Sequence, residues 1–322
     1  MARGISLHIG VNKLDKSKYP LKPPNPDYPN GWDGPLAACE NDADTMCELA
    51  KSQGFETLDV LKTKEATVEN VTAAVKKAAK ELSEGDIFLI SFAGHGGQLP
   101  DRSKDEKDLT PGDRMDETWM LYDRQFIDDE QYALYSEFEP GVRIVIVSDS
   151  CHSGTAMRGS ADSEDPGALT PAERKVFYGT DAPVSRSMRS GDALPMYLAR
   201  KKDYQKFEAE VGPVDVKADV LLISACQDDE EAADGPFNGK FTATLLDVWG
   251  DGFDGSYVEF HEKILGALQG EYDAILEARG GPAGGARGGP GSGGELKPPQ
   301  NPNFLTNDVK NEDFPKQTAF KI

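Results

Sequence analysis

The sequence lacks long hydrophobic runs and is poor in cysteine. No apolar run exceeds about five residues, whereas a membrane-spanning helix needs about 20, so a membrane protein is excluded. The cysteines number four and are scattered along 322 residues, which is too few for a fold held together by disulfides. No Cys-x-x-Cys pair occurs, and the four histidines have no zinc-ligand spacing. We therefore expect neither a disulfide scaffold nor a structural zinc site.

Basic residues are also in short supply. The chain has 35 Lys and Arg against 56 Asp and Glu, a formal net charge of −21 and a pI near 4.6. Such a chain offers no basic face to a phosphate backbone, so we expect no nucleic-acid partner. Its first residues resemble a strand and not the apolar stretch of a signal peptide. We expect a cytoplasmic monomer that makes no membrane contact.

Short β-rich runs alternate with helical patterns along most of the chain. Runs such as 144–147 and 220–223 are apolar on both faces, which is typical of strands covered by helices on both sides of a parallel sheet. The pattern predicts an α/β sandwich with a mostly parallel sheet of about six strands. The strands are predicted at 5–11, 57–61, 86–92, 143–148 and 220–224, and helices after Asp42, over 68–82 with Thr67 as cap, at 128–138 and at 241–249.

Two segments interrupt this alternation. Residues 155–212 are poor in periodic apolar pattern, and Gly280–Gly294 is a low-complexity glycine-rich stretch. Neither flanking part has enough strands to close a core alone, so we expect one domain over 1–322. Its parts would be 1–154, an inserted loop at 155–212, and 213–322 with the glycine-rich loop.

The residues that follow two of the predicted strands suggest chemistry. The 86–92 run leads into Gly94-His95-Gly96, and the 143–148 run leads into Asp149-Ser150-Cys151-His152. Ligands bind at the carboxyl ends of the strands in open parallel sheets, and consecutive strands tend to be neighbours. We therefore expect His95 and Cys151 to lie on the same edge of the sheet.

A histidine beside a cysteine suits nucleophilic catalysis. A free thiol has a pKa of about 8.5, and a nearby imidazole raises the reactive fraction and can protonate a leaving amine. The N–H groups of Gly96 and Cys151 could form an oxyanion hole, worth about 3 kcal/mol per donor. The alternative is that His95 fills a turn and Cys151 ends a core strand. His152 is not the expected base, because consecutive side chains diverge.

These motifs resemble the two signatures of caspase-clan cysteine peptidases, peptidase family C14, in its metacaspase-like and prokaryotic (orthocaspase) branch. The resemblance covers most of the chain and implies a caspase-like three-layer sandwich with helices on both faces of the sheet. Further stretches that resemble the family are Pro35 to Ala43, Asp116-Glu117, Ile127 to Glu130, Ser224 to Asp228, Ala233-Asp234 and Gly239 to Thr242.

The resemblance implies a catalytic dyad and an acidic specificity pocket. Cys151 would be the nucleophile and His95 the general acid and base. The positions that match the pocket, called S1, are Asp42 and Asp149, with Cys39 nearby and Ala93 where the family usually has serine. Paired carboxylates favour an arginine or lysine of the substrate and repel an acidic one. The alternative is that Asp42 caps a helix and Asp149 is a solvated strand end.

The same resemblance implies a calcium site. Acidic residues that match the family's ligands are Asp116, Asp128 and Asp129, and clustered carboxylates suit this cation. A fourth ligand of the family, seven residues after the cysteine, is Arg158 here, and its positive charge opposes metal binding. We therefore expect that calcium could bind, although one of its four matching ligands is replaced by Arg158, and we expect no other cofactor.

The 155–212 segment contrasts in charge with the acidic remainder of the chain. It places basic residues close in sequence to a pocket that should bind them, so we expect a zymogen activated by cleavage in this segment. The alternative is an uncut solvated linker. The candidate processing residues are Arg158, Arg186, Arg189, Arg200, Lys201 and Lys202.

The sequence thus predicts a cysteine endopeptidase that hydrolyses proteins after exposed Arg or Lys through an acyl-enzyme on Cys151. One alternative is a catalytically silent caspase-like module that binds a partner. Another is a thiol acyltransferase that uses the same dyad. The sequence names neither the physiological substrate nor an activating or inhibitory partner.

Overall fold

A six-stranded central sheet organises the chain. The computed structural model describes residues 2–100, 115–151, 169–180, 184–188, 190–210, 214–226, 232–279 and 298–322. The strands of the central sheet are β1 (Gly4–Gly10), β2 (Glu56–Lys62), β3 (Ile87–Ala93), β7 (Arg143–Asp149), β9 (Asp219–Ser224) and β11 (Asn303–Asp308). Their order is β11-β9-β7-β3-β1-β2, and only β11 runs antiparallel to its neighbour. The prediction of a mostly parallel sheet of about six strands is confirmed.

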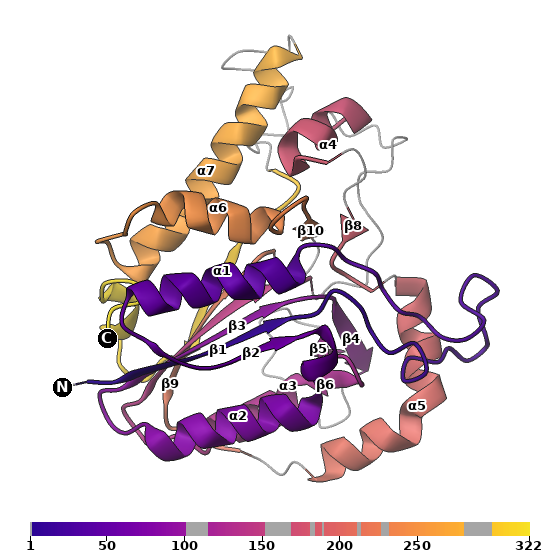
Figure 1. Cartoon of the computed structure of the whole chain (residues 1–322), viewed down its shortest axis with the longest axis horizontal. Coiled ribbons are helices and arrows are strands. Elements are labelled where there is room, and N and C mark those ends of the chain that lie inside the picture. The colour runs from indigo at the N-terminus through magenta and orange to yellow at the C-terminus, as the bar shows by residue number, and fades with distance from the viewer. Residues whose placement is uncertain are drawn as a thin grey trace, which may run out of the picture.

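Helices cover both faces of this sheet (Figure 1). One face carries α1 (Cys39–Ser52), α6 (Lys240–Trp249) and α7 (Tyr257–Ala278), and the other carries α2 (Val68–Glu81) and α3 (Asp128–Tyr135). Alternate residues of the strands supply the two cores: Ile87 and Leu89 pack in the core on the α1 side, while Phe88 and Ile90 pack in the core on the α2 side. The strands are apolar on both faces because each face is buried under a helical layer.

The second helix forms where the sequence predicts it. Thr67 precedes α2, and its side chain accepts a hydrogen bond from the Asn70 N–H, as an N-cap does. Val71, Val75 and Ala78 recur at helical spacing and are buried against the sheet. Two short 3₁₀ turns, Thr63–Glu65 and Phe314–Lys316, complete the helical elements of the described residues outside the 155–212 segment.

The segment between β7 and β9 contains more regular structure than the predicted loop. Its described residues form α4 (Pro171–Tyr178), the short strand β8 (Val184–Ser185) and α5 (Ser190–Glu210). In α5, Pro195 lies near the start and Arg200 departs from helical φ/ψ. Among the side chains of this helix that the structure describes, Met196, Tyr197 and Tyr204 are buried and Leu198 is exposed, so the described part shows no continuous apolar stripe.

A small second sheet lies beyond the end of β3. It consists of β4 (Gly96–Pro100), β5 (Met115–Met120) and β6 (Gln125–Ile127), all antiparallel. A two-stranded pair joins β8 to β10 (Ala233–Asp234). Because β4 begins one residue after His95, this small sheet fixes the backbone that follows the histidine. The sequence analysis did not predict it.

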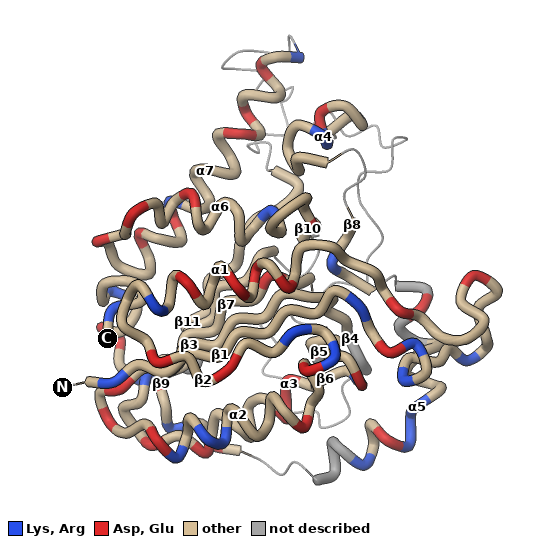
Figure 2. The backbone as a smooth tube through the Cα atoms, in the orientation of Figure 1, with Lys and Arg blue, Asp and Glu red and all other residues tan. Residues whose placement is uncertain are grey.

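Acidic residues recur along α1 and α7, and fewer basic residues lie between them (Figure 2). This distribution fits the excess of Asp and Glu in the sequence. Among the described helices, none is both long and apolar enough to cross a membrane.

A buried histidine lies in the middle of the central sheet. His8 of β1 is inaccessible to solvent, and its Nδ1 lies 2.8 Å from the Ser91 hydroxyl oxygen. Burial, with a smaller contribution from the charge of Lys51, lowers the pKa of His8 to about 3. His8 therefore becomes protonated near pH 6.5 in the unfolded chain but only near pH 3 in the folded chain.

We predict that this histidine makes the protein less stable as the pH falls. Below its unfolded pKa, about 6.5, each pH unit removes about 1.4 kcal/mol of unfolding free energy through His8. Between about pH 7 and pH 5 the wild type should lose roughly 2 kcal/mol more than His8→Leu. Urea unfolding of both proteins at the two pH values measures this difference. Parallel losses in the two proteins would contradict the assignment.

Candidate active site

The histidine and cysteine motifs leave neighbouring strands at the same level. Strands β3 and β7 are parallel, and Ala93 is the registered partner of Asp149. His95 and Cys151 each lie two residues beyond that pair. Equal spacing from a shared register brings both residues to one edge of the sheet, and both are buried there.

A backbone carbonyl orients the imidazole of His95. Its Nε2 lies 3.0 Å from the Gly34 carbonyl oxygen, and its ring packs on Trp32 with centroids 4.8 Å apart. Because a carbonyl can only accept, Nε2 carries the hydrogen and Nδ1 carries the lone pair. No described residue hydrogen-bonds Nδ1. Burial lowers the pKa of His95 to about 4, so the ring is neutral at pH 7 and Nδ1 can accept a proton.

Gly34 has to be a glycine in this arrangement. Its φ is +45°, in the left-handed region, and a Cβ there would lie 2.9 Å from the His95 ring. A side chain would displace the imidazole. The carbonyl that orients the base thus depends on the absence of a side chain at position 34.

A segment of the chain itself lies across this edge. The carbonyl oxygen of Arg186 accepts hydrogen bonds from the N–H of Gly96 at 2.9 Å and of Cys151 at 3.4 Å. The Arg186 N–H donates to the Ala232 carbonyl at 2.9 Å, and the Met188 N–H donates to the Gly96 carbonyl at 3.0 Å. Residues 184–188 are therefore held by backbone hydrogen bonds on both sides of the Arg186 carbonyl.

The thiol of Cys151 lies beside this segment. Its Sγ is 3.5 Å from the Ala232 carbonyl oxygen, the same atom that accepts the Arg186 N–H, and it also contacts the Ala232 N–H. Cys151 thus donates its backbone N–H to the Arg186 carbonyl, and both residues contact the Ala232 carbonyl oxygen.

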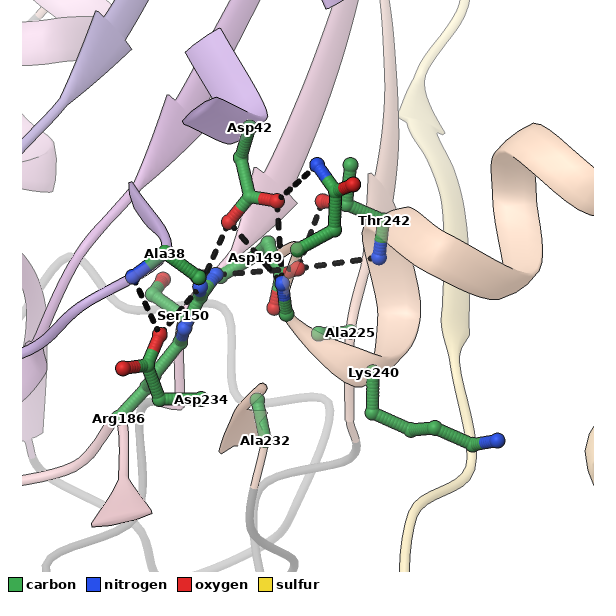
Figure 3. Close-up of polar contacts among 12 residues, drawn as sticks. Ala38, Asp42, Asp149, Ser150, Arg186, Ala225, Ala232, Asp234, Lys240 and Thr242 are labelled. Carbon is green, nitrogen blue, oxygen red and sulfur yellow. Dashed lines mark hydrogen bonds and ion pairs between the residues drawn. The ribbon is translucent and has the colours of Figure 1, made fainter. Parts of the chain in front are cut away.

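The side chain of Arg186 is fully buried among three carboxylates (Figure 3). Its Nη2 lies 2.6 Å from Asp42 Oδ2 and 2.8 Å from Asp234 Oδ1. Its Nη1 lies 3.0 Å from Asp149 Oδ2 and also donates to the Asp149 carbonyl at 3.2 Å. We call Asp42, Asp149 and Asp234 the acidic pocket.

Backbone and side-chain donors fix each of the three carboxylates. Asp42 Oδ1 accepts from the Gly239 N–H at 3.0 Å, and Asp149 Oδ2 accepts from the Thr242 N–H at 3.0 Å and from its hydroxyl at 2.6 Å. Asp234 accepts from the N–H groups of Ala37 and Ala38 at 2.6 and 3.2 Å. The pocket is therefore rigid, because each carboxylate is held from a second direction.

The pocket carries more negative than positive charge. Burial raises the pKa of Asp42 to about 6, although the Arg186 guanidinium acts in the opposite direction. For Arg186, burial opposes the charged form, but the carboxylates outweigh it, and its pKa lies above its ordinary value. The three carboxylates therefore stabilise the positive charge of Arg186 in this pocket.

Gly239 forms one wall of the acidic pocket. A Cβ at this position would lie 2.4 Å from Asp149 Oδ2 and 2.5 Å from Arg186 Nη1. Any side chain there would fill the space that the guanidinium occupies. The pocket therefore has room for the guanidinium only because residue 239 is a glycine.

The structure brings most of the predicted pocket residues together. Asp42 and Asp149 both contact Arg186, Cys39 is buried nearby with its pKa raised by burial, and Ala93 is buried at the end of β3. The alternative reading of the two acids is wrong. Asp42 lies inside α1, whose N-cap is Ala38, and Asp149 is buried and not solvated.

Two functional groups were missed by sequence reasoning. Asp234 was noted only as part of a stretch that resembles the family, although it is the third carboxylate on Arg186. The Gly34 carbonyl gives no side-chain signal, and only the glycine itself hints at a close approach of the backbone.

The expected calcium site gains no support from the described residues. Both carboxylate oxygens of Asp128 accept backbone N–H groups, from Glu117 and Asp129. In the described ranges, no group of three or more His, Cys, Asp or Glu side chains is arranged to hold a metal ion. The side chains of Asp116 and Arg158 lie outside the described residues. We assign no step to calcium.

The other candidate processing residues differ from Arg186. Arg200, Lys201 and Lys202 lie in α5, where the backbone is helical or kinked and not extended. Arg200 is further held by the carbonyls of Lys18 and Asp123 at 3.2 and 3.1 Å. Arg158 and Arg189 lie outside the described residues.

Comparison with known proteins places this chain in one family. The caspase domain family of peptidase C14 matches residues 24–285, so the chain belongs to this family. It is similar to Metacaspase-1 of Mycosarcoma maydis, 26% identical over 66% of this chain and 57% of that protein, and to Metacaspase-4 of Arabidopsis thaliana, 25% identical over 76% and 64%. The chain spans about 60% of the length of these metacaspase relatives.

A solved structure covers nearly the whole chain. It is the crystal structure of protein GSU0716 from Geobacter sulfurreducens, which is 37% identical, has a TM-score of 0.71 and matches 99% of each chain. The family match and the metacaspase relatives together make the chain a metacaspase-like member of the caspase-domain family of peptidase C14.

We predict that removing the buried guanidinium destabilises the fold. In a Cys151→Ala background, which prevents self-cleavage, Arg186→Leu leaves three buried carboxylates without their cation and should cost roughly 3–5 kcal/mol of unfolding free energy. Arg3→Leu is the matched control, because Arg3 pairs with Glu56 and Glu81 at the surface and should cost about 1 kcal/mol or less. Urea unfolding measures both. Equal losses would mean that the acidic pocket does not depend on Arg186.

Proposed function

We propose that the chain is a cysteine endopeptidase that cleaves after arginine or lysine through Cys151 and His95, and that the bond between Arg186 and Ser187 is its first substrate. One observation carries the proposal. The Arg186 carbonyl oxygen accepts the N–H groups of Gly96 and Cys151 while its guanidinium is buried against Asp42, Asp149 and Asp234. A substrate poised for cleavage has two features at once: its reacting carbonyl oxygen accepts two oxyanion donors, and the side chain before the bond fills the specificity pocket.

The proposed acylation uses these groups. His95 Nδ1 takes the thiol proton of Cys151, and the thiolate attacks the Arg186 carbonyl carbon. The oxygen becomes negative and is stabilised by the Gly96 and Cys151 N–H groups. His95 then returns the proton to the Ser187 nitrogen, the C–N bond breaks, and Arg186 is left as a thioester on Cys151 with a free amino group on Ser187.

Deacylation restores the enzyme. His95 takes a proton from water, and the resulting hydroxide attacks the thioester carbonyl. The C–S bond breaks, His95 returns its proton to the Cys151 sulfur, and the new carboxylic acid of Arg186 gives its proton to water and leaves as a carboxylate. The Gly34 carbonyl serves both halves of the reaction, since it keeps Nε2 protonated and leaves the lone pair on Nδ1.

The acidic pocket accounts for the proposed specificity. A guanidinium or ammonium replaces Arg186 between the same carboxylates, whereas an acidic side chain would meet three like charges without water to screen them. The pocket is filled by Arg186 in the intact chain. Cleavage, followed by departure of Arg186, would therefore open the pocket to other proteins, which is how a zymogen is activated.

Self-cleavage gives the first test of this function. The purified wild type should yield a fragment whose amino terminus is Ser187, as found by sequencing and mass spectrometry, while Cys151→Ala stays intact. Arg186→Glu should also stay intact, because its side chain is repelled by the acidic pocket. Arg200→Gln is the matched control and should be cut like the wild type. A wild type that stays intact, or a cut elsewhere in all variants, would contradict Arg186–Ser187 as the site.

Short reporters test the specificity separately. Peptides with a fluorophore directly after Arg, Lys or Asp should be hydrolysed after Arg and Lys, and the Asp reporter should be slower by about a hundredfold or more, since opposing a buried like charge costs several kcal/mol. Asp234→Asn should reduce kcat/KM for the Arg reporter, because it removes one partner of the guanidinium. Faster turnover of the Asp reporter would exclude the acidic pocket as S1. A wild type that neither cleaves itself nor turns over any reporter would favour the silent, partner-binding alternative.

A further inference from the structure

We propose that the site has a second selective pocket, which takes an apolar side chain two residues after the cleaved bond and which Met188 fills in the intact chain. This inference rests on the proposed function, because it treats residues 184–188 as a bound substrate. It extends that function from the residue before the bond to the residues after it. We call this second pocket the Met188 pocket.

The burial of the bound segment singles out two positions. Val184 is 44% exposed, and Ser185 and Ser187 are half-buried. Arg186 is 0% exposed and Met188 is 1% exposed. Side chains that point into the protein discriminate between substrates, while exposed ones do not. The segment therefore presents two anchors, arginine before the bond and methionine beyond it.

The backbone of β4 positions the second anchor. The Met188 N–H donates to the Gly96 carbonyl at 3.0 Å, and Ser187 forms a parallel bridge with Gly96. The N–H of Gly96 meanwhile donates to the Arg186 carbonyl. One residue of the enzyme thus holds both the reacting carbonyl and the residue two places after it, so the two pockets are fixed relative to each other.

Gly97 makes room for the methionine. A Cβ at position 97 would lie 3.3 Å from Met188 Cε, 3.2 Å from Thr118 Oγ1 and 3.1 Å from Gln125 Nε2. These three groups therefore surround the space that a side chain at position 97 would enter. The terminal methyl of Met188 is therefore next to residues of the small sheet, Gly97 of β4, Thr118 of β5 and Gln125 of β6.

The polar groups beside this methyl are occupied with one another. Gln125 Nε2 donates to Thr118 Oγ1 at 3.1 Å, and Thr118 Oγ1 donates to the Gly97 carbonyl at 3.0 Å. The Tyr204 hydroxyl of α5 donates to Gln125 Oε1 at 3.0 Å. A charged substrate side chain would have to break this chain of hydrogen bonds or lose its water without replacement. An apolar side chain needs neither.

The predicted substrate class follows from both anchors. It has a basic residue before the bond, a small residue after it, and an apolar residue such as Met or Leu in the next place. Burying such a side chain should raise kcat/KM about tenfold to a hundredfold over an aspartate in the same place. Reporters that end in a fluorophore after arginine do not reach this pocket.

A peptide series tests the Met188 pocket. Internally quenched peptides of the form Val-Ser-Arg-Ser-Xaa, with Xaa as Met, Leu, Ala or Asp, should be cleaved by processed enzyme with Met and Leu fastest and Asp slowest. The matched control is Asp-Ser-Arg-Ser-Met, which carries the same charge at the position equivalent to exposed Val184 and should lose less than threefold. This control measures how much of any loss comes from general repulsion between an acidic peptide and an acidic protein.

The enzyme's own Met188 is a competitor for the pocket, so the series is repeated with Met188→Gly enzyme, whose residue 188 has no side chain to place there. A preference for Met and Leu over Asp in either enzyme supports the proposal. Equal rates across the series in both enzymes would overturn it. The Arg-fluorophore reporter, measured beside the series, separates this outcome from failure of the proposed function, which would leave that reporter uncut as well.

Self-cleavage offers an independent measurement. Met188→Asp should slow the appearance of the Ser187 amino terminus about tenfold or more, Met188→Leu should retain the wild-type rate within about threefold, and Val184→Asp should resemble Met188→Leu. Circular dichroism and urea unfolding in the Cys151→Ala background establish that each variant folds. Equal slowing by Val184→Asp and Met188→Asp would mean that charge, and not the pocket, decides the rate.

Discussion

The burial of one guanidinium among three carboxylates controls the arrangement of this site. A buried charge is tolerated only when it is paired and hydrogen-bonded, and Arg186 meets this condition through Asp42, Asp149 and Asp234. These carboxylates come from α1, β7 and β10, which lie far apart in the sequence. The cation therefore connects the first half of the chain to the second, and its own backbone is carried to the oxyanion donors as a result.

The same carboxylates also serve the local structure around them. Asp149 accepts the N–H of Thr242 in the first turn of α6, and Asp234 accepts N–H groups immediately before α1. Anions suit such places, because the first N–H groups of a helix have no partner within the helix. Helix starts and specificity pocket thus use common atoms, so the pocket is preformed by the fold and does not have to be assembled by a substrate.

Much of the fold and part of the site could be predicted from the sequence. The parallel strands are apolar on both faces, and Thr67 with its apolar stripe defines α2, so local patterns sufficed there. The histidine and cysteine motifs were found because both follow strong strands. The third carboxylate, the Gly34 carbonyl and the position of Arg186 depend on long-range packing, which no local pattern records. The kinked α5 escaped notice because the sequence of 190–210 has no regular apolar spacing.

The place of Arg186 in the topology determines whether the two pieces of a cleaved chain stay associated. Residue 186 lies between β7 and β9, which are hydrogen-bonded neighbours in the middle of the central sheet. A break in the chain at this point severs no strand pairing, and the two cores on either side of the sheet each contain residues from both pieces. The two polypeptides of a nicked molecule would consequently migrate together under native conditions and separate only in denaturant.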